Sequence, residues 1–226
     1  MNSFDETANR YQEALQHNLR FVPGGTDFYY ENRAKLARAM RLSTAKTDSI
    51  LDFGGGIGLA IPHLRRQFPH SKIYIYDSSE ESVARAAQEN ESVSALTLEQ
   101  LRSQKFDIIF VAGVIHHISP DERAQTLEIL RDSLSHHGTI CIFELNPLNP
   151  VTRRLVANCP FDEDASLISK ASLTKVISEI DGLGVKGGGY TVFMPPILKA
   201  LWPAERLLRW LPLGAQYYLK VHGCRN

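Results

Sequence analysis

The chain has 226 residues, and its 25 basic residues balance its 25 acidic residues to a formal net charge of zero. This balance gives no basic footprint for nucleic acid, no apolar run approaches the roughly 18 residues that span a bilayer, and the three scattered cysteines suit neither a zinc site nor a disulfide framework. We therefore expect one domain over residues 1–226, a monomer or homodimer in the reducing cytoplasm, with no metal and no stable membrane anchor.

The first 45 residues have a helical pattern broken at Pro23-Gly24-Gly25, and from residue 46 onward strand-like and helical segments alternate. This alternation predicts an α/β, doubly wound sheet. The apolar runs are nearly continuous, which is typical of parallel strands covered on both faces. The expected strands lie near Ser49 to Phe53, Lys72 to Tyr76, Ser92 to Leu96, Phe106 to Ala112 and Thr139 to Leu145.

The clearest helix between these strands begins at Ser119-Pro120-Asp121-Glu122. Ser119 is expected to cap the helix, and Glu122 completes a capping box. Gly138 can close the same helix, since glycine adopts the left-handed conformation that commonly follows a last turn.

The C-terminal third predicts a helix over Ala171 to Ile180 and two further strands, over Tyr190 to Met194 and over Ala215 to His222. Between these strands, near residues 195–212, lies a helical insertion rich in leucine and tryptophan. We favour a lid or core helix here over a membrane-surface element, because Arg206 and Arg209 are few cations for the latter.

A glycine-rich turn follows the first strand, in the form Asp-x-Gly-x-Gly-x-Gly. Asp52 ends the strand, and the turn contains Gly54, Gly55, Gly56 and Gly58. Glycine permits a tight turn with positive φ angles, and the helix that follows from Leu59 presents free N–H groups to a ligand.

A second acid, Asp77, lies at the end of the next predicted strand. It follows Gly58 by nineteen residues, and an acid about 20 residues after a glycine turn is placed to accept hydrogen bonds from ribose hydroxyls. The glycine phase differs from the Gly-x-Gly-x-x-Gly of dinucleotide sites. An anion at Asp52 favours a ligand with a cationic amine over a pyrophosphate.

On these motifs the chain resembles the class I S-adenosylmethionine-dependent methyltransferases. The segment from Phe106 through His116-His117 to Ile118 looks like the family's fourth strand and the loop behind it. Phe4-Asp5, Ala8 and Tyr11 look like the N-terminal motif of the ubiquinone/menaquinone-methyltransferase-like branch.

The resemblance implies a Rossmann-like sheet of seven strands with the last strand antiparallel, and an N-terminal helical lid over residues 1–45. It implies S-adenosyl-L-methionine as cofactor. The third strand lacks the acid often seen at the adenine edge, so apolar side chains near Leu96 and Leu98 are expected to hold the adenine. The residues expected to bind the cofactor are Asp52, Gly54, Gly55, Gly56, Gly58, Asp77, Ser78, Leu98, Ala112, Gly113 and Tyr11.

Catalytic candidates follow the fourth and fifth strands. His116 and His117 can serve as general base, since imidazole accepts a proton near neutral pH, or can bond to backbone at the start of the next helix. Glu144 can orient a substrate hydroxyl or amine. Methyl transfer needs alignment and exclusion of water more than an elaborate catalytic set.

The loop after Glu144 resembles a subgroup of bacterial methyltransferases linked with polysaccharide or natural-product pathways. Its Asn146 and Asn149 can contact substrate or form turns. Arg153 and Arg154 can clamp an anion, although such a pair is more often a solvated helix face. The implied acceptor is a small molecule, such as a sugar, a glycolipid or a natural-product intermediate.

We therefore expect methyl transfer to a small molecule, with oxygen favoured as acceptor, then nitrogen, then carbon. Two alternatives stay open: a protein with this fold that binds the cofactor without transferring methyl, and a nicotinamide-dependent oxidoreductase.

Overall fold

A computed structural model describes residues 25–41, 48–159, 165–194 and 204–223. Its centre is a seven-stranded sheet in the order β3-β2-β1-β4-β5-β7-β6. β7 runs antiparallel to both of its neighbours, and the remaining pairs are parallel. The predicted fold is confirmed. The strands are β1 Ser49–Phe53, β2 Lys72–Tyr76, β3 Val93–Ala95, β4 Phe106–Ala112, β5 Leu134–Leu145, β6 Leu183–Thr191 and β7 Gln216–Gly223.

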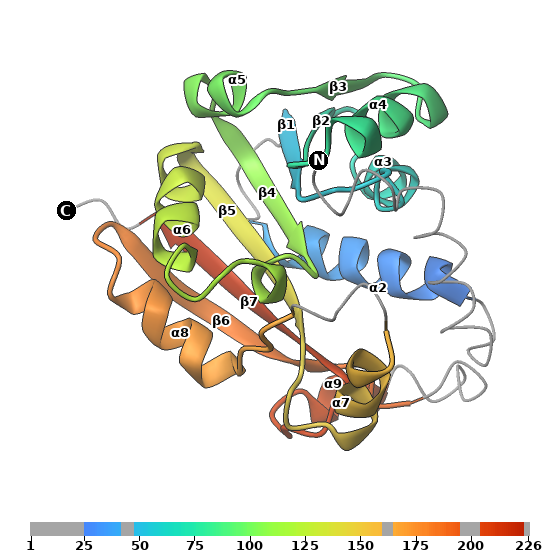
Figure 1. Ribbon diagram of the computed structural model, residues 1–226, viewed down its shortest axis with the longest axis vertical. Coiled ribbons are helices and arrows are strands. Elements are labelled where there is room, and N and C mark those ends of the chain that lie inside the picture. Colours follow the sequence, from blue (N-terminus) through green and yellow to red (C-terminus); the bar gives the residue numbers. More distant parts are fainter. Residues whose placement is uncertain (1–24, 42–47, 160–164, 195–203, 224–226) are drawn as a thin grey trace.

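Helices cover both faces of the sheet (Figure 1). One apolar cluster joins the sheet to helices α2, α3 and α4, and the other joins it to α5, α6 and α8. The elements are α2 Gly25–Met40, α3 Ile61–Gln67, α4 Glu80–Glu89, α5 Leu98–Ser103, η2 Ile115–His117, α6 Arg123–Asp132, α7 Pro150–Ala157, α8 Lys170–Ser178 and α9 Glu205–Leu208.

The central strands are buried because they lie between these two layers. Ile50, Leu51, Ile108 and Ile109 are all fully buried, and alternate residues of one strand contribute to opposite clusters, as the alternation of side chains along a strand requires. The apolar runs of β1 and β4 are thus explained by burial on both faces, whereas Val93–Ala95 of the edge strand β3 are partly buried or exposed.

Both ends of α6 differ from the prediction. The helix begins at Arg123 rather than behind Ser119, and it ends at Asp132. Gly138 therefore caps no helix and lies within β5, which begins five residues earlier than expected. A Cβ at Gly138 would lie 2.7 Å from the carbonyl oxygen of Phe106, so the glycine serves a close approach of two backbones at a bulge between β4 and β5.

β6 also begins earlier than predicted, at Leu183 rather than Tyr190, and Met194 lies beyond its end. The part of this strand before Tyr190 is rich in glycine. Glycine has a low strand propensity, so this part lacks the apolar pattern from which a strand is predicted. A Cβ at Gly188 would lie 2.6 Å from the carbonyl oxygen of Tyr218 on β7. The glycine allows the two strands to approach.

The N-terminal helix that the structure describes, α2, packs on the sheet. Ala34, Leu36, Ala37 and Met40 are buried in one of the two apolar clusters, and Figure 1 shows the helix passing the carboxyl end of β4. The predicted motif residues Phe4, Asp5, Ala8 and Tyr11 lie outside the described residues, as do Trp202 and Pro203.

Candidate functional site

The glycine turn joins β1 to α3 at the carboxyl edge of the sheet. Gly54, Gly56 and Gly58 have φ angles of 66°, 52° and 79°, a region that glycine adopts without steric cost. The N–H groups of Gly54 and Gly55 donate to the carbonyl oxygen of Tyr76, at 2.7 and 3.2 Å. The turn is therefore anchored on the neighbouring strand.

The three glycines have different surroundings. A Cβ at Gly54 would lie 2.6 Å from a methyl group of Val114, and one at Gly58 would lie 2.8 Å from Ile61. At Gly56 no atom lies within 4 Å of the same position. The turn is thus packed at both ends and open at its centre, which is where a ligand can approach the backbone.

Asp77 is bonded to the backbone of Gly56, the glycine at the open centre of the turn. Its Oδ2 accepts a hydrogen bond from the N–H of Gly56 at 2.8 Å, and its Oδ1 accepts one from Ser79 at 3.0 Å. An ionised carboxylate has about four acceptor positions, and these bonds use two. The partly buried Asp77 is therefore held in place with acceptor capacity to spare.

Asp52 lies at the end of β1 and is only 2% exposed. Its Oδ2 has no hydrogen-bond partner within the described parts of the chain. Burial and, second, the charge of Asp77 raise the pKa of Asp52 from 3.8 to about 7, while Arg33 acts in the opposite direction. A buried carboxylate oxygen without a partner costs free energy, and a cationic or hydrogen-bond-donating ligand would remove that cost.

Arg33 is the basic residue whose charge lowers the pKa of Asp52. It was not among the residues predicted from the sequence. It lies on α2, is 8% exposed, and donates from Nε to the side chain of Gln216 on β7 at 3.1 Å. A guanidinium carries four further N–H donors. Only tertiary packing brings α2 to the sheet edge, so no sequence pattern around Arg33 indicates this position.

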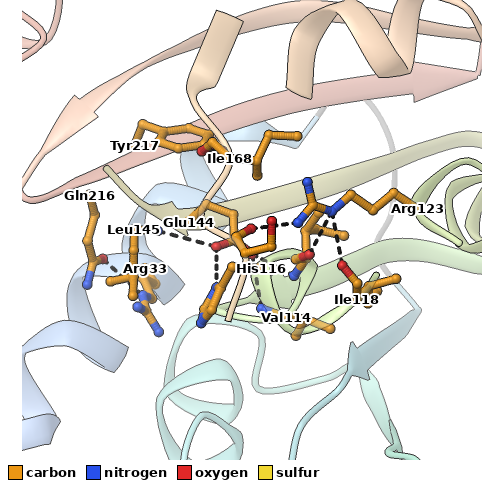
Figure 2. A network of polar contacts seen from close by, with 12 residues as sticks. Arg33, Val114, His116, Ile118, Arg123, Glu144, Leu145, Ile168, Gln216 and Tyr217 are labelled. Atoms are coloured by element: carbon orange, nitrogen blue, oxygen red, sulfur yellow. Dashed lines mark hydrogen bonds and ion pairs between the residues drawn. The ribbon is translucent and has the colours of Figure 1, made fainter. Parts of the chain in front are cut away.

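The loop after β4 is organised by Glu144, from the end of β5 (Figure 2). Its Oε1 accepts the N–H groups of Val114 and Ile115 at 3.0 and 2.7 Å. Its Oε2 lies 2.6 Å from Nδ1 of His116 and accepts the N–H of Leu145 at 3.3 Å. Glu144 is 1% exposed, and these four contacts occupy its acceptor positions.

The electrostatics agree with an ionised Glu144. Burial by itself would raise the pKa of Glu144, but the charge and hydrogen bond of His116, with the N–H groups of Ile115 and Leu145, lower it overall. The carboxylate therefore holds the loop that carries Gly113 and His116. Gly113 has a φ of 75° and donates its N–H to the carbonyl oxygen of Phe143 on β5.

The two histidines differ in exposure. His116 is 3% exposed and bonds to Glu144, whereas His117 is exposed, and their ring centroids lie 4.2 Å apart. With Nδ1 of His116 held by a carboxylate, the tautomer with a proton on Nδ1 is favoured, so Nε2 is the basic nitrogen.

Two buried residues that the sequence analysis did not identify complete this network. Arg123 donates from Nε to the carbonyl oxygens of Ile115 and Ile118, at 3.2 and 3.1 Å. The hydroxyl of Tyr217 donates to the carbonyl oxygen of Ile168 at 2.9 Å. Both appear in Figure 2 around Glu144. Arg123 sits in an ordinary amphipathic helix pattern, which gave no signal of this role.

The loop after β5 uses its asparagines for turns. The buried Asn146 donates from Nδ2 to the carbonyl oxygens of Pro212 and Gly214, at 3.0 and 2.7 Å. Asn149 caps α7 by accepting the N–H of Thr152 at 2.9 Å. Asn146 also accepts the N–H of Leu148 through Oδ1 at 3.1 Å. This bond and the cap at Asn149 support the turn-forming role that the sequence allowed for both asparagines.

The remaining predicted residues are spread along the same edge. Ser78 is exposed beside Asp77, Ala112 is partly buried at the end of β4, and Leu98 is 38% exposed at the first position of α5. Arg153 and Arg154 are exposed on α7. Tyr11 lies outside the described residues.

The described residues contain no group of three histidine, cysteine or acidic side chains able to hold a metal ion. Within the same residues, no helix has the length and apolar character needed to cross a membrane.

Comparison with known proteins identifies what this architecture resembles. Residues 51–140, from β1 into β5, match the model of a family described as a methyltransferase domain. No curated protein matches the chain in sequence.

Solved structures match over nearly the whole chain. The plantazolicin methyltransferase BpumL in complex with SAH is 15% identical, with a TM-score of 0.67, and the match covers 99% of this chain and 95% of that one. A SAM-dependent methyltransferase from Archaeoglobus fulgidus is 14% identical, with a TM-score of 0.65 and coverages of 95% and 100%.

A third structure, the mitomycin 7-O-methyltransferase MmcR, is 12% identical with a TM-score of 0.63. The match covers 99% of this chain but 61% of that chain. The chain therefore has the Rossmann-like fold of these methyltransferases, and residues 51–140 are similar in sequence to a methyltransferase domain.

Proposed function

We propose that this chain is an enzyme that binds S-adenosyl-L-methionine and transfers its methyl group to a small molecule. The observation that carries the proposal is the open centre of the glycine turn, where Gly56 bonds to Asp77 and the buried Asp52 leaves Oδ2 without a partner in the described chain. The methyltransferase-domain match over the same residues supports it.

Asp77 is the proposed ribose-binding residue. Each ribose hydroxyl can donate a hydrogen bond, and Asp77 keeps about two acceptor positions after bonding to the turn. Ser78 beside it is exposed and can add a hydroxyl contact. The exposed Leu98 offers apolar surface for the adenine, whereas Leu96 is buried in an apolar cluster of the core.

Asp52 and Arg33 suit the amino-acid end of the cofactor. That end is a zwitterion, with one ammonium and one carboxylate. The buried Asp52 would be held as an anion once the ammonium lies beside it, and Arg33 is a cation whose charge lowers the pKa of Asp52. Opposite charges in a low-dielectric site attract strongly, so the pair would both bind the zwitterion and orient it.

The cofactor would supply an electrophilic methyl group on a sulfonium whose leaving group is a neutral thioether. The chain then has to align the acceptor, exclude water and, where the acceptor carries a proton, accept it. Gly54, Gly55, Gly58, Ala112 and Gly113 shape the backbone edge on which the cofactor is proposed to lie.

For the proton, we propose His116 as the first candidate and the exposed His117 as the second. Glu144 fixes the orientation of His116 through Nδ1, as carboxylates orient other catalytic imidazoles. Because its acceptor positions are filled, Glu144 acts in this scheme as a positioning residue. It does not contact the acceptor.

Oxygen is the first choice of acceptor atom, then nitrogen, then carbon. Among the similar folds, MmcR is described as a 7-O-methyltransferase and BpumL as a plantazolicin methyltransferase, which supports a small-molecule acceptor. A sugar, glycolipid or natural-product intermediate, a cytoplasmic location and the ubiquinone/menaquinone-methyltransferase-like branch are the finer parts of the proposal.

Titration calorimetry tests the cofactor. Wild type should bind S-adenosyl-L-methionine, and Asp77→Ala should bind at least tenfold more weakly because two ribose bonds are lost. Asp121→Ala removes an exposed acid from the turn before α6 and should bind as wild type does. Equal binding by Asp77→Ala and wild type would contradict the ribose assignment.

Two further measurements separate the alternatives. If NAD(H) or NADP(H) displaced the bound cofactor, the oxidoreductase would be favoured. Release of S-adenosyl-L-homocysteine with a panel of small hydroxyl and amine acceptors supports transfer. Tight cofactor binding without release across the panel would favour a binding protein.

A further inference from the structure

Large apolar side chains gather at one edge of the molecule. Seven are exposed in the described chain, and six of them lie on two short segments, one around α7 and the other in and after α9. Leu98 is the seventh. The six are Leu148, Val151, Leu155, Leu207, Trp210 and Leu213, and the exposed fractions of these six run from 47% to 76%. Single exposed apolar residues are ordinary, but a group of this kind marks an interaction site.

The two segments are tied together by hydrogen bonds. Asn146 bonds to the carbonyl oxygens of Pro212 and Gly214, and Nδ2 of Asn149 donates to that of Leu213 at 2.7 Å. Figure 1 shows α7 and α9 at the same end of the molecule. We refer to residues 148–157 and 204–213 together as the α7–α9 surface.

The apolar side chains face outward because other residues hold the segments down. On α7, Thr152 is the buried residue and donates its hydroxyl to the carbonyl oxygen of Ala215 at 3.0 Å. Val151 and Leu155 are four residues apart and share a different side of the helix. After α9, Arg209 packs over the ring of Tyr218, and Trp210, the next residue, is 76% exposed.

The exposed charged side chains of the α7–α9 surface are all basic. Arg153, Arg154 and Arg206 are exposed. The single acid within the two segments is Glu205, and its Oε1 accepts the N–H groups of Phe193 and Met194, both at 2.9 Å. Exposed leucine, valine and tryptophan beside exposed arginine is the composition of an interfacial membrane element.

We propose that the α7–α9 surface docks reversibly on an anionic lipid surface. The apolar side chains would enter the headgroup region, and the arginines would contact lipid phosphates, which attract basic residues near the membrane. The same charges argue against a second copy of this chain as the occupant, since a twofold interface would bring like-charged arginines together.

The sequence favoured a lid or core helix for this segment, because the C-terminal insertion by itself has two arginines. The exposed side chains of the folded chain give the membrane-surface element more support. Folding ties the loop that leads into α7, the helix of Arg153 and Arg154, to Leu213 through Asn149. Leu207 and Trp210, at 76% exposed, are not core residues.

Co-sedimentation with vesicles tests the proposal on the full chain. Binding should be at least tenfold stronger to vesicles with about one third phosphatidylglycerol than to pure phosphatidylcholine, and should weaken in high salt. Three acids, Asp162, Glu163 and Asp164, follow α7 in the sequence and would be repelled by anionic lipid. Binding is therefore measured over a series of vesicles with increasing anionic fraction. No binding to any vesicle in the series would overturn the proposal.

Matched variants locate the contact. Leu207→Ser with Trp210→Ser should lower vesicle binding at least tenfold, while Trp210→Phe should retain it. Arg153→Gln with Arg154→Gln should remove most of the dependence on anionic lipid. Arg102→Gln with Lys186→Gln removes the same charge from exposed positions elsewhere and should bind as wild type does.

Two results would count against the surface. One is undiminished vesicle binding by the Leu207/Trp210 variant. The other is a concentration-dependent dimer in sedimentation velocity that the same variant abolishes, which would identify a second copy as the occupant. Thermal unfolding of each variant checks that its fold is intact.

Discussion

At the scale of single residues, the two acids at the carboxyl ends of the first two strands are chemically unlike. Asp77 is held by two N–H groups, whereas Asp52 is buried with Oδ2 unpartnered in the described chain. Glu144 is buried too, but its four contacts compensate for its charge. Burial is therefore costly only at Asp52, and a site that binds a cation is one place where such a cost is retained.

Asp52 predicts a pH dependence of stability. Its pKa of about 7 in the folded protein exceeds its usual 3.8, so between these values the folded state binds the proton and the unfolded state does not. The contribution of Asp52 to stability is then lost as the pH rises from about 4 to about 7, on the order of 4 kcal/mol.

The measurement is the free energy of unfolding of the unliganded protein at several pH values, compared with Asp52→Asn. The variant cannot ionise, so its stability relative to wild type should increase with pH across this range. A constant difference between the two proteins from pH 4 to pH 8 would show that Asp52 has an ordinary pKa.

At the scale of elements, the glycine turn combines two requirements in one segment. Its ends pack against Val114 and Ile61, and its centre is open. The sequence motif does not distinguish these glycines, but the space around each of them differs.

Alanine substitutions distinguish them. Gly54→Ala should destabilise the protein by about 2 to 4 kcal/mol, because it adds a clash with Val114 to the cost of a positive φ. Gly56→Ala should cost only about 1 kcal/mol, yet should weaken S-adenosyl-L-methionine binding at least tenfold because its methyl group fills the open position.

Urea unfolding and titration calorimetry on the two variants supply the comparison. If Gly56→Ala bound the cofactor as wild type does, the open position would not be where the ligand lies. Equal loss of stability in both variants would show that the clash at Gly54 relaxes without cost.

At the scale of the whole molecule, the network around Glu144 joins distant parts of the chain. It connects the end of β5 to the loop after β4, and Arg123 extends it to the carbonyl oxygen of Ser166, at 2.5 Å, on the segment before α8. These groups are separated by tens of residues, so they meet only in the folded state.

Glu144→Gln should therefore reduce global stability by roughly 3 kcal/mol, the usual result of breaking a buried, hydrogen-bonded pair on one side. The amide can still accept from Val114 and Ile115, but its NH₂ group would face His116 and the N–H of Leu145. Exposed Glu122, which accepts a bond from Ser119, offers the control: Glu122→Gln should change stability by about 0.5 kcal/mol or less.

Chemical denaturation of both variants decides this prediction. A loss for Glu144→Gln no larger than that for Glu122→Gln would mean that the network contributes little to the fold.

The sequence by itself determined the order of strands and helices, the glycine turn and the pair Asp52 and Asp77, because these depend on local periodicity and short spacing. It misplaced the end of α6 and the start of β6, where Gly138 and Gly188 serve close backbone approaches between strands. Only the tertiary structure decided that the charge of Arg33 lowers the pKa of Asp52 and that groups of the loop after β4 bond to the carboxylate of Glu144. It also decided that Arg153 and Arg154 belong to the same surface as Trp210. Those relations depend on contacts between residues far apart in the chain, which no local pattern records.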